Sequence, residues 1–284
     1  MMIQQKNELA LTANHIRAGI LRGVYAAKSG HPGGSLSIAD IMTYLYLVEM
    51  KHDPKNPKWE GRDRFVLSKG HAAPAFYATL AHMGYFAEAE LDKLRHTGEM
   101  LQGHPEMKHT PGVDMSTGSL GQGLSAACGM ALAAKLKKTG ERVYAVVGDG
   151  ESQEGQIWEA VMFAKHQKLD NLCVVIDNNG LQIDGPLSEV SGIEPFDVKF
   201  EAFGWNVEKI DAHNFDEIEA AYKSARECKD KPTAIIAKSI KGKGVSFMEG
   251  LVSWHGAAPD KEQFDAAMKE ISDRIDELKK EGGV

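Results

Sequence analysis

Two short polar segments carry the oxygen ligands that a divalent cation bound to a diphosphate requires. Gly148-Asp149-Gly150 follows one strand-like apolar run, and Asn179 lies just after the next. Mg²⁺ takes about six oxygen ligands and usually combines one or two protein carboxylates or amides with phosphate oxygens. Asp149 would supply charge and Asn179 a neutral amide oxygen, without a second carboxylate to repel the diphosphate. Gly148 and Gly150 would let the backbone approach the anion.

Each segment alone is weak evidence, because Asp-Gly pairs are common in ordinary turns. The elements around them make the pattern more specific. Residues 142–147 and 172–176 are predicted strands, and residues 154–168 carry a helical pattern. Such a βαβ unit has a right-handed crossover and brings both segments to the carboxyl edge of a parallel sheet, where ligands bind. A helix beginning near Ser152 would point its free amides toward the anion.

The rest of the chain continues this alternation, which is typical of a parallel sheet flanked by helices. Further strands are expected at 64–67, 205–210 and 233–237, and further helices at 7–28, 37–50, 72–83, 121–137, 214–228 and 260–280. The irregular stretches 96–119 and 238–259 are rich in Gly and His, which favours functional loops. We therefore expect a single α/β domain over residues 1–284.

Composition argues against several classes of function. The 284 residues include 40 Asp or Glu and 33 Lys or Arg, giving a formal charge of −7. This acidic balance does not favour a nucleic-acid-binding surface. The sequence has neither a secretory signal nor an apolar stretch long enough for a membrane span. Its three cysteines are too far apart for a Cys-x-x-Cys site. We expect a soluble cytoplasmic protein that binds neither nucleic acid nor membrane.

The Gly-Asp-Gly to Asn-Asn pattern resembles the thiamine diphosphate signature of thiamine enzymes, and other segments narrow the resemblance to transketolase. They are Ser-Gly-His-Pro-Gly-Gly at 29–34, Arg-Asp-Arg-Phe-Val-Leu-Ser-Lys-Gly-His at 62–71, Gly-His-Pro-Glu at 103–106, Ser-Thr-Gly-Ser-Leu-Gly-Gln-Gly at 116–123 and Ser-Trp-His-Gly at 253–256. The resemblance implies the diphosphate-binding domain of the thiamine diphosphate-binding fold. It also implies thiamine diphosphate and Mg²⁺ (or Ca²⁺) as cofactors, and transfer of a two-carbon ketol unit from a ketose phosphate to an aldose phosphate.

The resemblance also assigns roles to individual residues. The metal ligands would be Asp149, Asn179 and Leu181. The residues that contact the donor's oxygens and move protons would be His31, His104 and His255. The cofactor contacts would come from His71, Gly118, Ser119, Leu120, Asp149, Gly150, Glu154, Asn179, Lys241 and His255. Neutral imidazoles suit this chemistry because they donate or accept a proton near pH 7.

Several of these assignments have simpler alternatives. A lone histidine is more often a surface residue than a catalytic one. The segment 118–120 could be an ordinary helix N-cap, and Lys241 could belong to a mobile basic loop. Glu154 corresponds in the family to a buried glutamate that links the two active sites of a dimer, but it could also be an exposed first-turn residue favoured by the helix dipole. His213 needs no functional explanation.

Only the diphosphate-binding half of a normal transketolase is represented. No segment resembles the pyrimidine-binding domain, which carries the glutamate that activates the cofactor and the arginines that hold the sugar phosphate. We therefore expect an N-terminal subunit that is active with a C-terminal subunit in a heterotetramer. The Gly/Ala-rich helix 121–136 would provide self-association. The alternatives are half of deoxyxylulose-phosphate synthase or of an alpha-keto-acid dehydrogenase, a specialised ketol transferase, and a non-catalytic cofactor-binding module.

Overall fold

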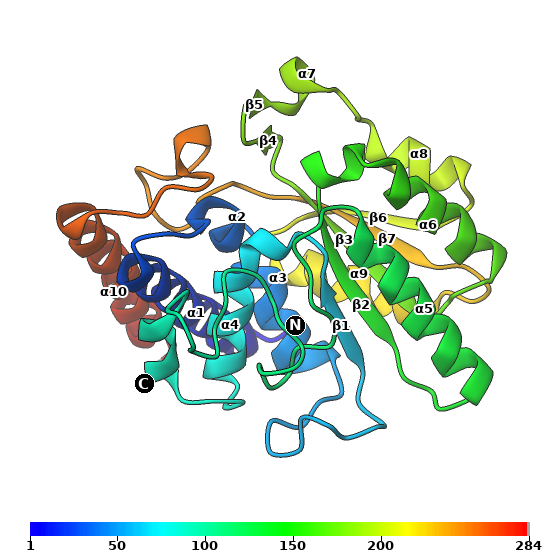
Figure 1. Cartoon of the computed structure of the whole chain (residues 1–284), viewed down its shortest axis with the longest axis horizontal. Helices are drawn as coiled ribbons and strands as arrows, with labels where there is room; N and C mark the ends of the chain where they lie inside the picture. The colour runs from blue at the N-terminus through cyan, green and yellow to red at the C-terminus, as the bar shows by residue number, and fades with distance from the viewer. Residues whose placement is uncertain (283–284) are drawn as a thin grey trace.

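The computed structural model describes residues 1–282 and is built around a parallel five-stranded sheet in the order β1-β2-β3-β7-β6 (Figure 1). The strands are Arg64–Leu67 (β1), Val143–Gly148 (β2), Leu172–Asn178 (β3), Asn206–Asp211 (β6) and Thr233–Lys238 (β7). Each pair of neighbours is parallel. The expected strands and the α/β class are confirmed, with strand ends moved by no more than two residues.

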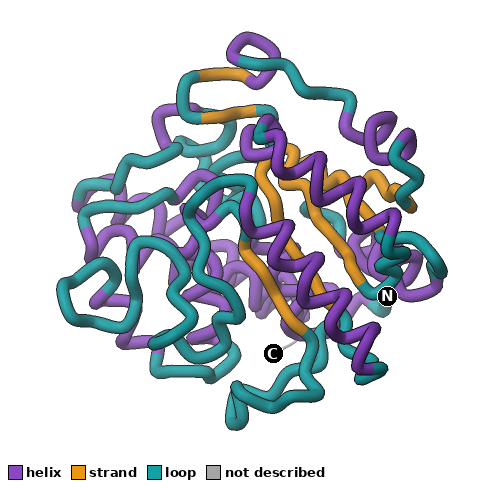
Figure 2. Tube along the Cα trace, turned by 45° about the vertical axis from the view of Figure 1, so that its right-hand side comes forward, coloured by secondary structure: helices purple, strands orange, loops and turns teal. Residues whose placement is uncertain are grey.

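Helices cover both faces of the sheet. One face carries α1 (Ile3–Ala27), α3 (Ala39–Tyr44), α4 (Ala73–His82), α9 (Phe215–Glu227) and α10 (Lys261–Gly282). The other carries α5 (Gln122–Lys137), α6 (Gly155–His166) and α8 (Phe196–Ala202). In Figure 2 two long helices cross in front of the strands. None of the helices within residues 1–282 has the length and apolar character to cross a lipid bilayer.

The central strands are apolar throughout because both of their faces are buried. In β2, Val143, Ala145 and Val147 pack in the core beneath α5 and α6. The intervening residues Tyr144 and Val146 pack in the opposite core, against α1 and its neighbours. A parallel strand covered on both sides therefore reads as a continuous apolar run instead of an alternating one.

The expected helix 37–50 is confirmed from Ala39 to Glu49, as α3 continued by a π-helical turn, and it begins two residues later than expected. A short helix, α2 (Pro32–Leu36), precedes α3, and a π-helical turn (η1, Leu45–Glu49) follows α3. The turn between α2 and α3 contains Ser37, whose hydroxyl lies 3.1 Å from the Gly34 carbonyl oxygen and donates to the Asp177 carboxylate at 2.8 Å. The bond to Asp177 crosses from the helical layer to the sheet.

The helix after β2 also begins later than expected. Gly150–Gln153 forms a 3₁₀ turn (η4), and α6 begins at Gly155 and not near Ser152. The Ser152 hydroxyl donates to the Gly148 carbonyl oxygen at 2.9 Å, which holds the turn against the strand end. The small hairpin of β4 (Leu181–Gln182) and β5 (Gly185–Pro186), the helix α7 (Leu187–Val190) and α8 were not anticipated.

The two long irregular stretches are present, and they flank the carboxyl edge of the sheet. Residues 94–121 contain no helix or strand and follow the 3₁₀ turn η3 (Glu88–Lys93). Residues 239–260 follow β7 and contain only the 3₁₀ turn η5 (Val252–Trp254). These loops and the strand ends supply the residues of the candidate site.

Candidate functional site

Asp149 and Asn179 lie at the carboxyl ends of the neighbouring strands β2 and β3. The buried Asp149 carboxylate accepts the backbone N–H of Gly180 at 2.6 Å through Oδ2 and that of Gly150 at 2.7 Å through Oδ1. One amide therefore ties Asp149 to the residue that follows Asn179. Burial, and then the charge of Asp177, raise the pKa of Asp149 to about 7. A carboxylate in this position would be stabilised by a bound cation.

Asp177 fixes the orientation of the Asn179 amide. Asn179 Nδ2 donates to Asp177 Oδ2 at 3.0 Å. Burial alone would raise the pKa of Asp177, but the neighbouring Lys69 holds it below its usual value, so the carboxylate is ionised and only accepts hydrogen bonds. The Asn179 amide oxygen must therefore lie on the opposite side of the group, where it accepts the Leu181 N–H at 3.1 Å. This arrangement leaves amide-oxygen lone-pair capacity for a cation.

Lys241 contacts the third expected metal ligand. Its ammonium donates to the Leu181 carbonyl oxygen at 3.1 Å and lies 2.9 Å from His255 Nδ1. The residue is only 2% exposed. Burial, and then the charge of Lys69, lower the pKa of Lys241 to about 8. Lys241 is therefore not part of a mobile basic loop, and a metal ion at the Leu181 carbonyl would share or take over that oxygen.

The donor set fits a hard cation that also binds a diphosphate. Asp149, Asn179 and the Leu181 carbonyl offer oxygen atoms only. Within residues 1–282, no group of three or more His, Cys, Asp or Glu side chains could hold a metal ion. Mg²⁺ completes an octahedron with phosphate and water oxygens, whereas structural zinc needs four protein ligands, usually nitrogen or sulfur. The residues present therefore suit Mg²⁺ or Ca²⁺ better than zinc.

A buried ion pair supports these strand ends, and the sequence patterns did not reveal it. Lys69 Nζ donates to the Asp177 carboxylate and to the Gly34 carbonyl oxygen, both at 2.6 Å. The hydroxyls of Ser37 and Ser239 also donate to Asp177. Lys69 lies in the family-like segment 62–71, and Asp177 directly precedes the Asn pair at the end of an apolar run. The signal in the sequence that could have revealed this pair was a charged residue, Asp177, at the end of an otherwise apolar strand.

Three of the expected histidines form a cluster above these strand ends. The ring centroids of His31, His71 and His255 lie 5.2 to 5.4 Å apart. Burial, followed by nearby positive charges, lowers the pKa of His31 and of His255 to about 4. The pKa of His71 is well below its usual value for the same reason. The imidazoles are therefore neutral at pH 7, and the buried Nδ1 of His31 has no hydrogen-bond partner among residues 1–282.

The fourth histidine, His104, reaches this cluster through a tightly packed loop. Gly118 has φ +134°, and a Cβ atom on it would lie 2.9 Å from the His104 ring. A Cβ atom on Gly70 would lie 2.6 Å from the Gly118 nitrogen. Glycine is therefore required at these contacts, which hold the loop 116–121 against His104 and the turn η2 (Gly70–Ala72). This places Gly118 beside the cluster.

Arg95 is a second site residue that the sequence patterns did not reveal. Its guanidinium donates to the Ser29 hydroxyl at 2.9 Å. After burial, Arg95 is the strongest contributor to the lowered pKa of both His31 and His104. It precedes the irregular stretch 96–119 by one residue, and no feature of the sequence around it marked it as functional.

The buried glutamate beside the site within this chain is Glu151. It accepts the Ser68 hydroxyl at 2.5 Å, the Gly121 N–H at 3.0 Å and the Gly148 N–H at 2.9 Å. Glu154 is exposed on this chain, so its burial would need a second chain and stays a prediction. By holding Gly121, Glu151 also positions the preceding residues 118–120, of which Ser119 and Leu120 are exposed.

The small residues of α5 fall into two groups. A Cβ atom on Gly123 would lie 2.6 Å from the Ser68 hydroxyl oxygen, so this glycine permits close packing against the end of β1 inside the chain. Gly129, Ala133 and Leu136 are exposed, and Leu136 keeps 74% of its surface accessible. Only this outward face is free for the expected self-association, which stays a prediction.

Comparison with known proteins places the whole chain in one family. The family model for "Transketolase, thiamine diphosphate binding domain" matches residues 9–273. The 6-deoxy-6-sulfo-D-fructose transketolase subunit SqwG of Clostridium sp. (strain MSTE9) is 48% identical over 270 residues, which are 95% of this chain and 98% of that subunit. An apulose-4-phosphate transketolase subunit of Phocaeicola vulgatus is 42% identical over 277 residues, or 98% of each chain.

Full-length transketolases match over less than half of their length. Human transketolase is 43% identical over 278 residues, which are 98% of this chain but 44% of the human protein. The crystal structure of the Campylobacter jejuni enzyme superposes with a TM-score of 0.87 at 37% identity, covering 96% of this chain and 43% of that chain. The sequence segments, the geometry of the sheet edge and these similarities agree: the chain belongs to the transketolase family and corresponds to its N-terminal thiamine diphosphate-binding domain.

Proposed function

We propose that this chain is the cofactor- and metal-binding subunit of a ketol transferase that acts on sugar phosphates together with a second, pyrimidine-binding chain. The observation that supports this most directly is the meeting of Asp149 and Asn179 at one sheet edge, below four histidines whose pKa values are all lowered. The two relatives that this chain matches over 98% of their length are both named as transketolase subunits.

The cofactor site would be formed by residues from four strand ends. Asp149, the Asn179 amide oxygen and the Leu181 carbonyl oxygen would hold Mg²⁺ or Ca²⁺. His71, Gly150 and Lys241 would contact the diphosphate, and His255 would contact the cofactor from the loop after β7. The segment 118–120 would face the aminopyrimidine with backbone groups. When bound, thiamine diphosphate would supply the carbon nucleophile that accepts the two-carbon unit.

His31, His104 and His255 would handle the donor's oxygens. Each is neutral near pH 7, because burial and nearby cations lower its pKa. A neutral imidazole can donate one hydrogen bond and accept another, so it can pass a proton as a carbonyl becomes a hydroxyl and back. The unpartnered Nδ1 of His31 supports this role, since a buried ring nitrogen without a partner in residues 1–282 is unfavourable unless a ligand satisfies it.

The partner chain would complete the active site. It would carry the glutamate that activates the cofactor and the arginines that bind the sugar phosphate. The outward face of α5 and the exposed Glu154 would contact a second copy of this chain, giving a heterotetramer with two-fold symmetry.

Reconstitution tests the proposal. Ketol transfer from xylulose 5-phosphate should be absent with this chain alone and should appear when the candidate partner chain is added. Full activity of the isolated chain would contradict the two-chain arrangement. In the reconstituted enzyme, Asp149→Ala should abolish metal-dependent binding of thiamine diphosphate while leaving the circular dichroism spectrum unchanged. Unchanged cofactor affinity would contradict the assignment of Asp149 as a metal ligand.

A second candidate is a specialised ketol transferase with an unusual donor. The 48% identity to a subunit named for 6-deoxy-6-sulfo-D-fructose favours testing this possibility. A screen should compare fructose 6-phosphate, xylulose 5-phosphate, 6-deoxy-6-sulfofructose and apulose 4-phosphate by kcat/KM. A preference for either of the first two donors would support the general transketolase, and a preference for either of the last two would support the specialised enzyme.

A further inference from the structure

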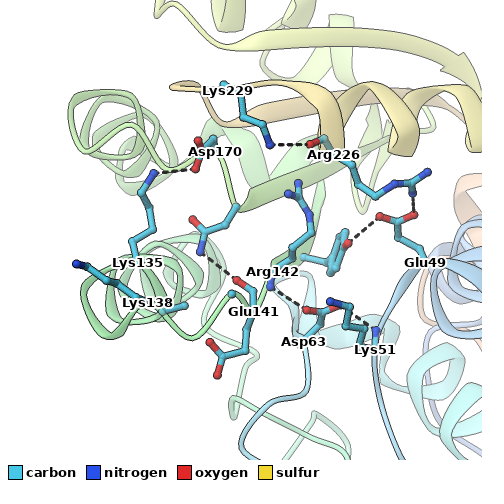
Figure 3. A pocket seen from close by; sticks show the side chains of 14 residues that line it. Glu49, Lys51, Asp63, Lys135, Lys138, Glu141, Arg142, Asp170, Arg226 and Lys229 are labelled. Atoms are coloured by element: carbon cyan, nitrogen blue, oxygen red, sulfur yellow. Dashed lines mark hydrogen bonds and ion pairs between the residues drawn. The ribbon is translucent and has the colours of Figure 1, made fainter.

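A cationic pocket lies at the edge of the sheet opposite the candidate site (Figure 3). It has a volume of about 520 Å³ and opens at the amino ends of β2 and β3. β2 has six residues, and at about 3.3 Å per residue it separates this pocket from Asp149 by roughly 20 Å. The pocket is therefore distinct from the cofactor site.

The pocket concentrates positive charge on an acidic chain. Its cationic residues are Lys51, Lys135, Lys138, Arg142, Arg226 and Lys229. Four carboxylates also line it, those of Glu49, Asp63, Glu141 and Asp170. The chain as a whole has a formal charge of −7. Six cations against four anions therefore make the pocket locally positive.

Two of these carboxylates are already satisfied by neighbouring donors. Asp63 accepts the backbone N–H groups of Lys51 and Arg142, each at 2.8 Å. Asp170 accepts Lys135 Nζ at 2.7 Å and the Asp230 N–H at 3.2 Å. These carboxylates bind backbone or a neighbouring lysine, and within residues 1–282 neither forms an ion pair with the side chain of Lys51 or Arg142.

The other two carboxylates are engaged as well. Glu49 accepts the Tyr144 hydroxyl at 2.8 Å and pairs with Arg226. Glu141 accepts the hydroxyl of Thr139. Figure 3 shows that the contacts of Glu49 lie along one wall of the pocket, away from Lys135 and Lys138. The acidic residues therefore leave part of the positive charge without a partner.

Arg142, Lys51 and Lys138 carry this unpaired charge. Among residues 1–282, the only side-chain hydrogen bond of Arg142 runs from Nη2 to the Ala225 carbonyl oxygen at 2.9 Å, and its buried Nε has no partner. Over the same residues, no carboxylate forms an ion pair with Arg142, Lys51 or Lys138. A guanidinium whose buried Nε has no hydrogen-bond partner and which forms no direct ion pair is unfavourable unless a ligand provides an acceptor.

We propose that this pocket binds the phosphate group of a small phosphorylated molecule. Arginine presents a planar fork of donors that matches phosphate oxygens, while lysine supplies compact point charges. The half-buried Arg142 and the exposed Lys51 and Lys138, which all line the pocket, combine both features. The volume of about 520 Å³ lies within the range of small-molecule sites, roughly 300 to 1,000 Å³. This inference does not depend on the proposed function.

Calorimetric titration at constant ionic strength tests the proposal. Inorganic phosphate and glucose 6-phosphate are the probes, and glucose is the uncharged comparison. Arg142→Gln should raise the Kd for phosphate about tenfold, the change expected for loss of one charge-assisted hydrogen bond. Lys51→Gln with Lys138→Gln should weaken phosphate binding as well. These two lysines are exposed, so this double variant decides the question if Arg142→Gln fails to fold.

Two control variants distinguish binding in this pocket from binding elsewhere on the chain. Lys269→Gln removes an exposed lysine on α10, outside the pocket, and should leave the Kd unchanged. Lys241→Gln removes a lysine of the candidate cofactor site and reports any phosphate that binds there instead of in the pocket. If Lys241→Gln abolishes phosphate binding while Arg142→Gln does not, phosphate binds at the cofactor site and the proposal is wrong. Equal weakening by Lys269→Gln would show nonspecific charge binding and would also overturn it.

The two probes distinguish the source of the phosphate. If both bind the parent chain and both are weakened by Arg142→Gln, the pocket takes phosphate esters. If only inorganic phosphate behaves in this way, the natural ligand is the free anion, and the proposal of a phosphorylated molecule is wrong. Saturable binding of neither probe would also overturn it.

Discussion

Replacing Lys69 with methionine should destabilise the chain strongly, because it leaves the buried Asp177 charge without its cation. Both side chains are almost fully buried, with side-chain exposures of 2% and 0%. Lys69 also satisfies the Gly34 carbonyl oxygen at 2.6 Å. Breaking a buried ion pair by removing one partner costs about 3–5 kcal/mol. We therefore expect Lys69→Met to lower the free energy of unfolding by about that amount.

Asp177→Asn with Lys69→Met removes both charges, so the double variant should lose less stability than the sum of the two single variants. For groups in direct contact, this coupling is on the order of 0.5–3 kcal/mol, and we expect the upper end because the pair is buried. Urea unfolding followed by tryptophan fluorescence measures all three variants. Lys269→Met, which removes an exposed ion pair on α10, is the matched control and should leave the midpoint unchanged.

Two results would refute the reasoning. A loss below about 1 kcal/mol for Lys69→Met would place it among ordinary substitutions and show that Asp177 does not need its cation. Strict additivity in the double variant would show that the two side chains act independently. Either outcome would also remove the argument that Asp177 is ionised and orients the Asn179 amide.

Three further predictions concern the same edge of the sheet. Gly118→Ala should lower stability by about 1–3 kcal/mol and abolish activity of the reconstituted enzyme, because the new methyl group meets His104 in a left-handed backbone conformation; an unchanged melting temperature would contradict this. His31 and His255 have pKa values of about 4 in the folded chain, against about 6.5 when unfolded. Between about pH 6.5 and pH 4 the unfolded state therefore binds more protons than the folded state, so the folded chain loses stability as the pH falls through this range. The variant His31→Gln with His255→Gln should lose less stability over that range, and a parallel pH profile for parent and variant would refute the assignment. Finally, His213 donates from Nδ1 to Asp40 and accepts the Ile240 N–H at Nε2 at 3.1 Å. His213→Ala should therefore release the segment that carries Lys241 and weaken the binding of thiamine diphosphate. Equal affinity of parent and variant by calorimetry would show that this contact does not position the lysine.

The sequence determined the sheet and the candidate metal ligands because both depend on short stretches of chain. A strand buried on both faces must be apolar throughout, so the runs at β2 and β3 are visible directly. Asp149 and Asn179 follow the ends of those runs, and parallel neighbours bring their carboxyl ends to the same edge. The transketolase resemblance rested on equally local segments, and the comparisons confirm it.

Only the tertiary structure decided what supports these residues. The Lys69–Asp177 pair joins positions 108 residues apart, and the Ser37–Asp177 bond that ties the turn before α3 to the sheet joins positions 140 residues apart. The buried Glu151 carboxylate accepts hydrogen bonds from Ser68 and Gly121, which lie far from it in sequence. Local patterns record which residues favour a strand or a turn, but a buried polar group takes whichever partner the packed chain brings within reach. The partners of Lys69, Arg95 and Glu151 were therefore fixed by packing.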